Sequence, residues 1–187
     1  MENISYSEHD LGNGILIIVE NGNDFDVDLD IRVTYYNENN EMISLGTDYL
    51  WGCAAKGKGV VQVPPPYNKK YEDLPYADYE IEILADNTDT DYYSKNYVSE
   101  LEIQSNISST DTVLATIKNP TGKTLDSVDL VCVYYRQGVP VGISMQYLDD
   151  FSRKETVEFY PPYDSDYNDI HFDDYEIIVN TAQYYLE

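Results

Sequence analysis

The stretch DFDVDLDIRVTY, residues 24–35, alternates polar and apolar side chains from end to end. Alternation with a period of two puts the apolar side chains on one face of a β-strand and the aspartates on the other. The expected inward side chains are Phe25, Val27, Leu29, Ile31, Val33 and Tyr35. In the second half of the chain the expected inward set is Val128, Leu130, Cys132 and Tyr134. The pattern therefore predicts a half-buried strand in the first half. In the second half Val131 and Val133 point outward, so we expect that face of the sheet to be covered as well.

A second stretch occurs twice in the chain. Residues 65–81 read PPYNKKYEDLPYADYEI and residues 161–177 read PPYDSDYNDIHFDDYEI, so nine of seventeen positions are identical. Chance gives about one identity in a comparison of this length. Upstream, Asn21 and Asn119 continue the correspondence at a similar spacing. Because a repeat of this length can bury a core of its own, we expect two similar domains and not a solenoid.

Short strands separated by turns are expected along the whole chain. Clusters of Asn, Gly and Pro separate the apolar segments, and no segment has the periodicity of a helix. Besides the two strands above, strands are expected near residues 14–20, 42–50, 59–63, 77–84, 97–104, 112–118, 139–148, 154–160 and 173–181. The sequence thus predicts an all-β fold of two tandem antiparallel β-sandwich domains, residues 1–94 and 95–187.

The charge of the chain excludes several kinds of partner. There are 35 acidic and 11 basic residues, which gives a net charge of -24. Both halves are acidic: residues 1–94 hold 19 acids and 5 bases, and residues 95–187 hold 16 acids and 6 bases. Such a surface repels phosphate backbones, so we expect no nucleic-acid partner. The longest aliphatic run, residues 15–19, is far shorter than the roughly 20 residues of a membrane span, so no direct membrane insertion is expected.

The sequence contains little that indicates catalysis, and we expect no enzyme activity and no cofactor. The only histidines are His9 and His171, and the chain lacks a nucleophile elbow, a zinc-type histidine pair and a phosphate-binding glycine loop. The two cysteines, Cys53 and Cys132, fall at different positions of the repeat and form no disulfide framework. Cys132 is expected to be a small buried hydrophobe.

One acidic loop has the oxygen ligands that calcium prefers, namely Asp164, Asp166, Asn168 and Asp169. The spacing departs from a twelve-residue calcium loop, which requires Gly at its sixth position and Glu at its twelfth. A solvated acidic loop is the favoured interpretation, so we expect no metal site.

Aromatic side chains are the candidates for ligand binding. Tyr67, Tyr71, Tyr163 and Tyr167 follow the two Pro-Pro pairs, where an extended backbone is expected to leave their rings partly exposed. The alternative is that these rings cover the open end of each sandwich. Trp51 has no aromatic counterpart in the second half, so it is either a site of the first domain or a core residue.

The second half contains, in order, Asn119, the strand Val128 to Tyr134, the turn at Gly138, Tyr147-Leu148 and a final Asp-Tyr-Glu strand at residues 174–176. This order of features resembles the small bacterial FxLYD-type, immunoglobulin-like domains. The resemblance covers both halves, and it implies immunoglobulin-like sandwiches of exported or lipid-anchored surface proteins. Tyr79 and Tyr175 resemble the corner tyrosine of such sandwiches, whose hydroxyl bonds upstream backbone.

These observations favour a non-catalytic, extracellular or cell-surface interaction module that recognises a protein or glycan. The alternatives are a structural spacer that presents another domain, and a calcium-dependent adhesive unit that uses the acidic loops. The resemblance implies export, so we expect the native export signal to lie outside this sequence.

Overall fold

The computed structural model describes residues 3–88, 94–163 and 169–186. In this part of the chain the only helical element is a 3-10 turn, Val98–Glu100, and all sheets are antiparallel. The predicted all-β fold is therefore confirmed. No helix among the described residues is long and apolar enough to cross a membrane.

The chain divides into two compact units, a first unit Met1–Thr88 and a second unit Asp89–Glu187. The boundary expected from the sequence lay after residue 94, within β7 (Ser94–Asn96). This short strand pairs with the second unit, because Asn96 lies opposite Gln183 and Ser94 opposite Tyr185.

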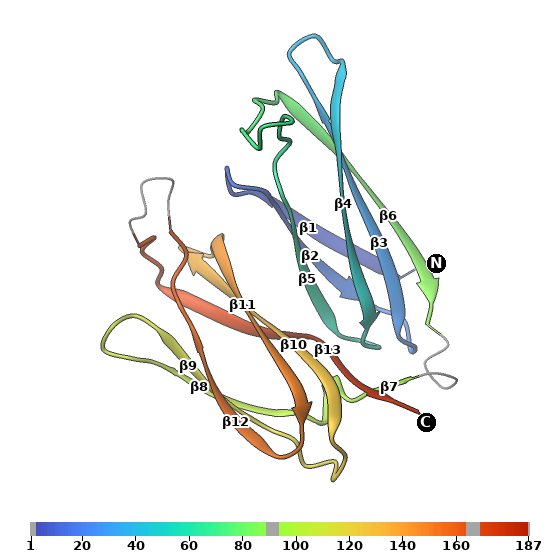
Figure 1. The fold of residues 1–187 in the computed structure, drawn as a ribbon, viewed down its shortest axis with the longest axis vertical. Helices are drawn as coiled ribbons and strands as arrows, with labels where there is room; N and C mark the ends of the chain where they lie inside the picture. Colours follow the sequence, from blue (N-terminus) through green and yellow to red (C-terminus); the bar gives the residue numbers. More distant parts are fainter. Residues whose placement is uncertain (1–2, 89–93, 164–168, 187) are drawn as a thin grey trace. The chain divides into compact units, whose positions relative to one another are not determined.

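The first unit consists of two three-stranded sheets, seen as two layers in Figure 1. One sheet has the order β1-β2-β5, with β1 (Ile4–Asp10), β2 (Ile15–Asn21) and β5 (Lys58–Val63). The other has the order β4-β3-β6, with β4 (Met42–Cys53), β3 (Val27–Tyr36) and β6 (Asp78–Asn87). The inward side chains of both sheets form one hydrophobic core.

The second unit has the same strand order with one strand added. One sheet is β12-β9-β8, with β12 (Lys154–Phe159), β9 (Val113–Lys118) and β8 (Glu102–Ile107). The other is β11-β10-β13-β7, with β11 (Val139–Phe151), β10 (Leu125–Arg136) and β13 (Asp174–Tyr185). A separate hydrophobic core lies between these sheets.

The alternation of polar and apolar residues in the segment 24–35 gives β3 its two faces. Val27, Leu29, Ile31, Val33 and Tyr35 are buried, and the polar residues between them are half-buried. Phe25 was expected to continue the inward row, but it precedes the strand and its side chain is exposed.

One expected strand was wrong, and one observed strand was missing from the prediction. The segment 97–104 is not one strand, because the 3-10 turn Val98–Glu100 precedes β8. Strand β1 lies where the sequence after Met1-Glu2 is strand-like, but it was not among the predicted strands because most of its residues are exposed and polar and form no regular apolar row. Cys53 and Cys132 are both buried free thiols, as expected for Cys132.

The buried tyrosines that bond backbone are not the expected ones. Tyr35 donates its hydroxyl to the carbonyl oxygen of Pro64 at 2.9 Å, and Tyr134 donates to that of Tyr160 at 3.0 Å. Both rings are fully buried on the central strands β3 and β10. Tyr175, expected in this role, is half-buried and donates instead to the Ser105 hydroxyl. The corner-tyrosine assignment was therefore wrong for Tyr175, because its ring at the start of β13 reaches a side chain of the facing sheet and not the buried backbone.

Candidate functional site

An exposed aromatic pair on β4 is the main candidate for a binding site. Trp51 and Tyr49 are two residues apart on the strand, so they lie on the same face, and their side chains are 60% and 52% exposed. Their ring centroids are 5.8 Å apart with an angle of 15° between the planes, so the rings are stacked. We call Tyr49 and Trp51 the aromatic platform.

Strand alternation explains why the tryptophan points away from the core. Leu50 is buried in the core cluster of the first unit, so its neighbours on the strand face the opposite side. The alternative that Trp51 is a core residue was wrong. Large exposed aromatic rings are common in contacts with ligands.

Charged side chains of β3 and β6 flank the aromatic platform. Asp30 lies opposite Tyr49 in the sheet register, and its Oδ2 is 2.6 Å from Nη2 of Arg32. Arg32 also lies 3.5 Å from a carboxylate oxygen of Glu82 on β6. The hydrogen bond with Asp30 and the charge of Asp30 raise the pKa of Arg32. The aromatic platform thus borders the ion-paired side chains of Asp30, Arg32 and Glu82, which offer hydrogen-bond donors and acceptors and carry a net negative charge.

The second unit has no equivalent pair. Tyr147 on β11 lies opposite Asp129 of β10, as Tyr49 lies opposite Asp30, and it is exposed as well. Asp149 follows it at the place that Trp51 holds in the first unit. A hydrogen bond to this carboxylate, with burial and the charge of Asp149 adding to it, raises the pKa of Tyr147. The aromatic platform is therefore a property of the first unit alone within the described residues.

The loop tyrosines of the first unit form a second exposed aromatic pair. Tyr67 and Tyr71 are 55% and 84% exposed, and their ring centroids are 5.7 Å apart at an angle of 24°. The loop is held by a bridge between Tyr67 and Asp73 and by the side chain of Asn68, whose Oδ1 accepts the backbone N–H of Lys70 at 2.7 Å. The rings of this pair therefore stand on an ordered turn.

In the second unit, Tyr163 is also exposed and forms the corresponding bridge with Asp169. Tyr167 lies outside the described residues, as do Asp164, Asp166 and Asn168 of the acidic loop.

The structure does not bring Trp51 and the loop tyrosines together. The backbone at Gly46 on β4 borders Val63 and Pro64, just before the loop that carries Tyr67. Trp51 lies five residues farther along the strand, which is roughly 16 Å at the rise of a β-strand. The predicted site residues of the first unit thus fall on two separate surfaces.

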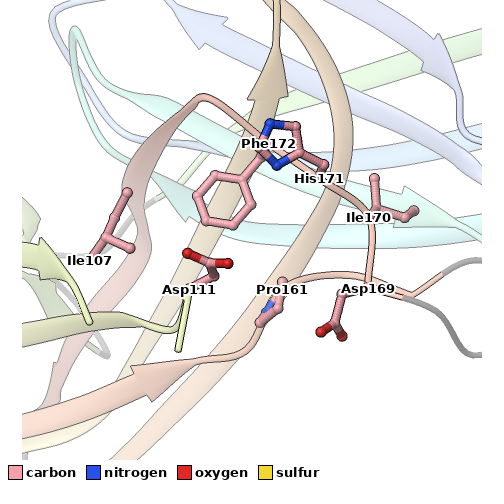
Figure 2. A pocket seen from close by; sticks show the side chains of 7 residues that line it. All are labelled: Ile107, Asp111, Pro161, Asp169, Ile170, His171 and Phe172. Carbon is pink, nitrogen blue, oxygen red and sulfur yellow. The ribbon is translucent and has the colours of Figure 1, made fainter. Parts of the chain in front are cut away.

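A pocket of about 200 Å³ opens in the second unit, shown in Figure 2. Its lining residues are Ile107, Asp111, Pro161, Asp169, Ile170, His171 and Phe172. Of these residues, the sequence indicated only Asp169 as a candidate for binding. The pocket combines segments that are far apart in the chain, so no local motif could reveal it.

The described residues contain no group of three or more His, Cys, Asp and Glu side chains that could hold a metal ion. The remaining residue that sequence reasoning missed is Tyr49. Its position two residues before Trp51 on an expected strand was the signal that could have identified the pair.

No protein-family model matches the chain, and no curated protein matches it in sequence.

Proposed function

We propose that the chain is a non-catalytic interaction module that binds a glycan through the aromatic platform. The observation that carries the proposal is the stacked, exposed pair Tyr49 and Trp51 beside the charged group of Asp30, Arg32 and Glu82. A planar aromatic surface takes the apolar face of a sugar ring, and the neighbouring polar groups bond its hydroxyls. Both features lie on one rigid sheet.

The charge of the chain narrows the class of glycan. With a net charge of -24 and carboxylates at the platform, an anionic sugar is repelled. A neutral or amino sugar is the ligand that this surface favours. A protein ligand of the kind expected from the sequence would require a larger apolar area than two rings provide.

The test uses the tryptophan as its own probe, because Trp51 is the only tryptophan in the chain. Neutral, amino-sugar and acidic oligosaccharides are screened for binding to the full chain, and the fluorescence of Trp51 is followed during titration. Losing the stacking contact costs about 1 kcal/mol, so Trp51→Ala should weaken binding about fivefold or more. Tyr147→Ala, at the matching place of the second unit, should leave binding unchanged.

Two results would contradict the proposal: binding that survives Trp51→Ala unchanged, or a preference for acidic sugars. The variants should keep the wild-type melting temperature, since exposed substitutions change stability by about 0.5 kcal/mol or less.

A structural spacer is the second candidate. The observation that favours it is that the second unit keeps the strand order of the first without the aromatic pair. A chain that binds none of the screened oligosaccharides would support the spacer instead.

We also propose that the two units are tandem immunoglobulin-like sandwiches of an extracellular or surface-anchored protein of the FxLYD type. The matching strand orders and the buried tyrosines at Tyr35 and Tyr134 support this proposal. Residues 1–88 and 94–187 are expected to fold separately with cooperative thermal transitions, which calorimetry can measure. Failure of both pieces to fold would contradict the tandem arrangement.

A further inference from the structure

The pocket of the second unit has a firm apolar floor. The ring of Phe172 is buried and packs edge-on against Tyr134, with centroids 4.7 Å apart. Tyr134 is in turn held by its hydrogen bond to the carbonyl oxygen of Tyr160. Ile107, Pro161 and Ile170 complete the apolar lining. Phe172 belongs to the hydrophobic core of the second unit and connects the pocket to it.

Two carboxylates stand at the rim. Asp111 belongs to the turn between β8 and β9, where its backbone N–H donates to the carbonyl oxygen of Ser108, and Asp169 precedes β13. Figure 2 shows Asp111 on the side of Ile107 and Asp169 on the side of Ile170, with Pro161 between the two carboxylates and the ring of Phe172 next to Asp111. Neither carboxylate takes part in a salt bridge among the described residues.

In the first unit, a hydrogen bond between two side chains occupies the position that corresponds to the pocket. Tyr76 packs edge-on against Tyr35 at 5.0 Å, as Phe172 packs against Tyr134, and its hydroxyl donates to Oδ2 of Asp10 at 2.8 Å. This bond ties the segment before β6 to the end of β1.

The strand register identifies the counterpart of Asp10 in the second unit. Asp10 lies opposite Ile15, the first residue of β2, and Ile107 lies opposite Val113, the first residue of β9. Ile107 therefore holds the place of Asp10, and Phe172 holds the place of Tyr76. The two residues that bond each other in the first unit are both apolar in the second, and both line the pocket.

We propose that this pocket binds a single alkylammonium group of the lysine type, with its chain between Ile107 and Phe172 and its charge at Asp111 and Asp169. The volume, about 200 Å³, is below the roughly 300–1,000 Å³ of pockets for larger organic ligands, so it suits one side chain. The carboxylates attract the cation, and the face of an aromatic ring favours it further. This site is independent of the glycan surface on the first unit.

The test is a titration of the full, isotopically labelled chain by NMR. The probes are n-butylammonium, the uncharged n-butanol and the anionic butyrate, and the signals to follow are those of Ile107 and Phe172. We expect n-butylammonium to cause saturable chemical-shift changes in the millimolar range, and we expect added salt to weaken its binding. The other two probes should cause no saturable shift changes. Equal shifts with n-butanol, or stronger binding of butyrate, would overturn the proposal.

Variants locate the site. Asp111→Asn keeps a residue type suited to the left-handed turn conformation of Asp111, where φ is 56°, and should weaken n-butylammonium binding about two- to fivefold. The double variant Ile107→Asp with Phe172→Tyr rebuilds the closed pair of the first unit and should abolish binding. Asp10→Asn in the first unit is the matched control and should leave binding unchanged. Binding that is insensitive to both Asp111→Asn and the double variant would refute the assignment.

The same titration with a short lysine-containing peptide distinguishes the two sources of the cation. Tenfold tighter binding of the peptide than of n-butylammonium assigns the pocket to a polypeptide side chain, and equal binding assigns it to a free amine. A glycan screen that fails leaves this test intact, because its variants and signals all lie in the second unit.

Discussion

Replacing one buried asparagine is expected to destabilise the second unit strongly. Asn119 is nearly fully buried, and its Nδ2 donates to the carbonyl oxygens of Phe151 and Lys123, both at 2.9 Å. Its Oδ1 accepts the backbone N–H of Thr121 at 3.1 Å and the Thr121 hydroxyl at 2.6 Å. One side chain thus joins three segments of backbone near the ends of β9 and β11.

The expected loss in the free energy of unfolding follows from the hydrogen-bonding groups that Asn119→Ala leaves without a partner. The carbonyl oxygen of Phe151 loses a partner in a buried place, which costs about 1–3 kcal/mol, and the contact with Lys123 is worth about 1 kcal/mol. Thr121 is partly exposed and its groups can turn to water, so their loss adds little. The expected total is about 3 kcal/mol, or a fall in melting temperature of more than about 10 °C for a unit of this size.

Urea and thermal unfolding followed by circular dichroism measure this loss. Asn106→Ala is the control, because Asn106 is exposed and makes one long hydrogen bond of 3.4 Å to the carbonyl oxygen of Ile107. It should change stability by about 0.5 kcal/mol or less. A loss of under about 1 kcal/mol for Asn119→Ala would show that the network does not hold the unit together. Asn21 bonds Phe25 and Cys53 in the same way, so Asn21→Ala should have a similar effect on the first unit.

Three further outcomes are expected. Burial raises the pKa of Cys53, of Cys132 and of Tyr35 to about 12 each, so the folded chain keeps protons that the unfolded chain loses. The free energy of unfolding should therefore fall as the pH rises from about 9 toward about 12, and urea midpoints that stay constant over this range would contradict the reasoning. Both thiols should resist a maleimide reagent in the native chain and react in urea, whereas labelling at equal rates in both states would disprove their burial. In Gly142→Ala the new methyl group meets the ring of Pro162, so a loss of about 1–3 kcal/mol is expected by urea unfolding, and an unchanged midpoint would show that this ring can move.

Local patterns explain why much of the fold was predictable. A strand shows its two faces directly in sequence, because successive side chains point to opposite sides, and β3 and β10 were read from that rule. Where the rule has no apolar row to act on, as in β1, the prediction failed. Tyr175 was misassigned for a related reason: parity tells which face a ring is on, but not which atom its hydroxyl reaches.

The amino-acid sequence by itself determined the all-β class, the alternation of the central strands, the acidic surface and the exposed rings of the loops that follow each Pro-Pro pair. These are properties of neighbouring residues and of composition. Only the tertiary structure decided that Asp30 lies beside the stacked pair of Tyr49 and Trp51, and that Ile107 and Phe172 leave a pocket open where Asp10 and Tyr76 bond. The pairing of β3 with β4 brings Asp30 to Tyr49, and the pocket joins the end of β8 to the segment before β13. Both arrangements bring distant segments together, which depends on how the core of each unit packs.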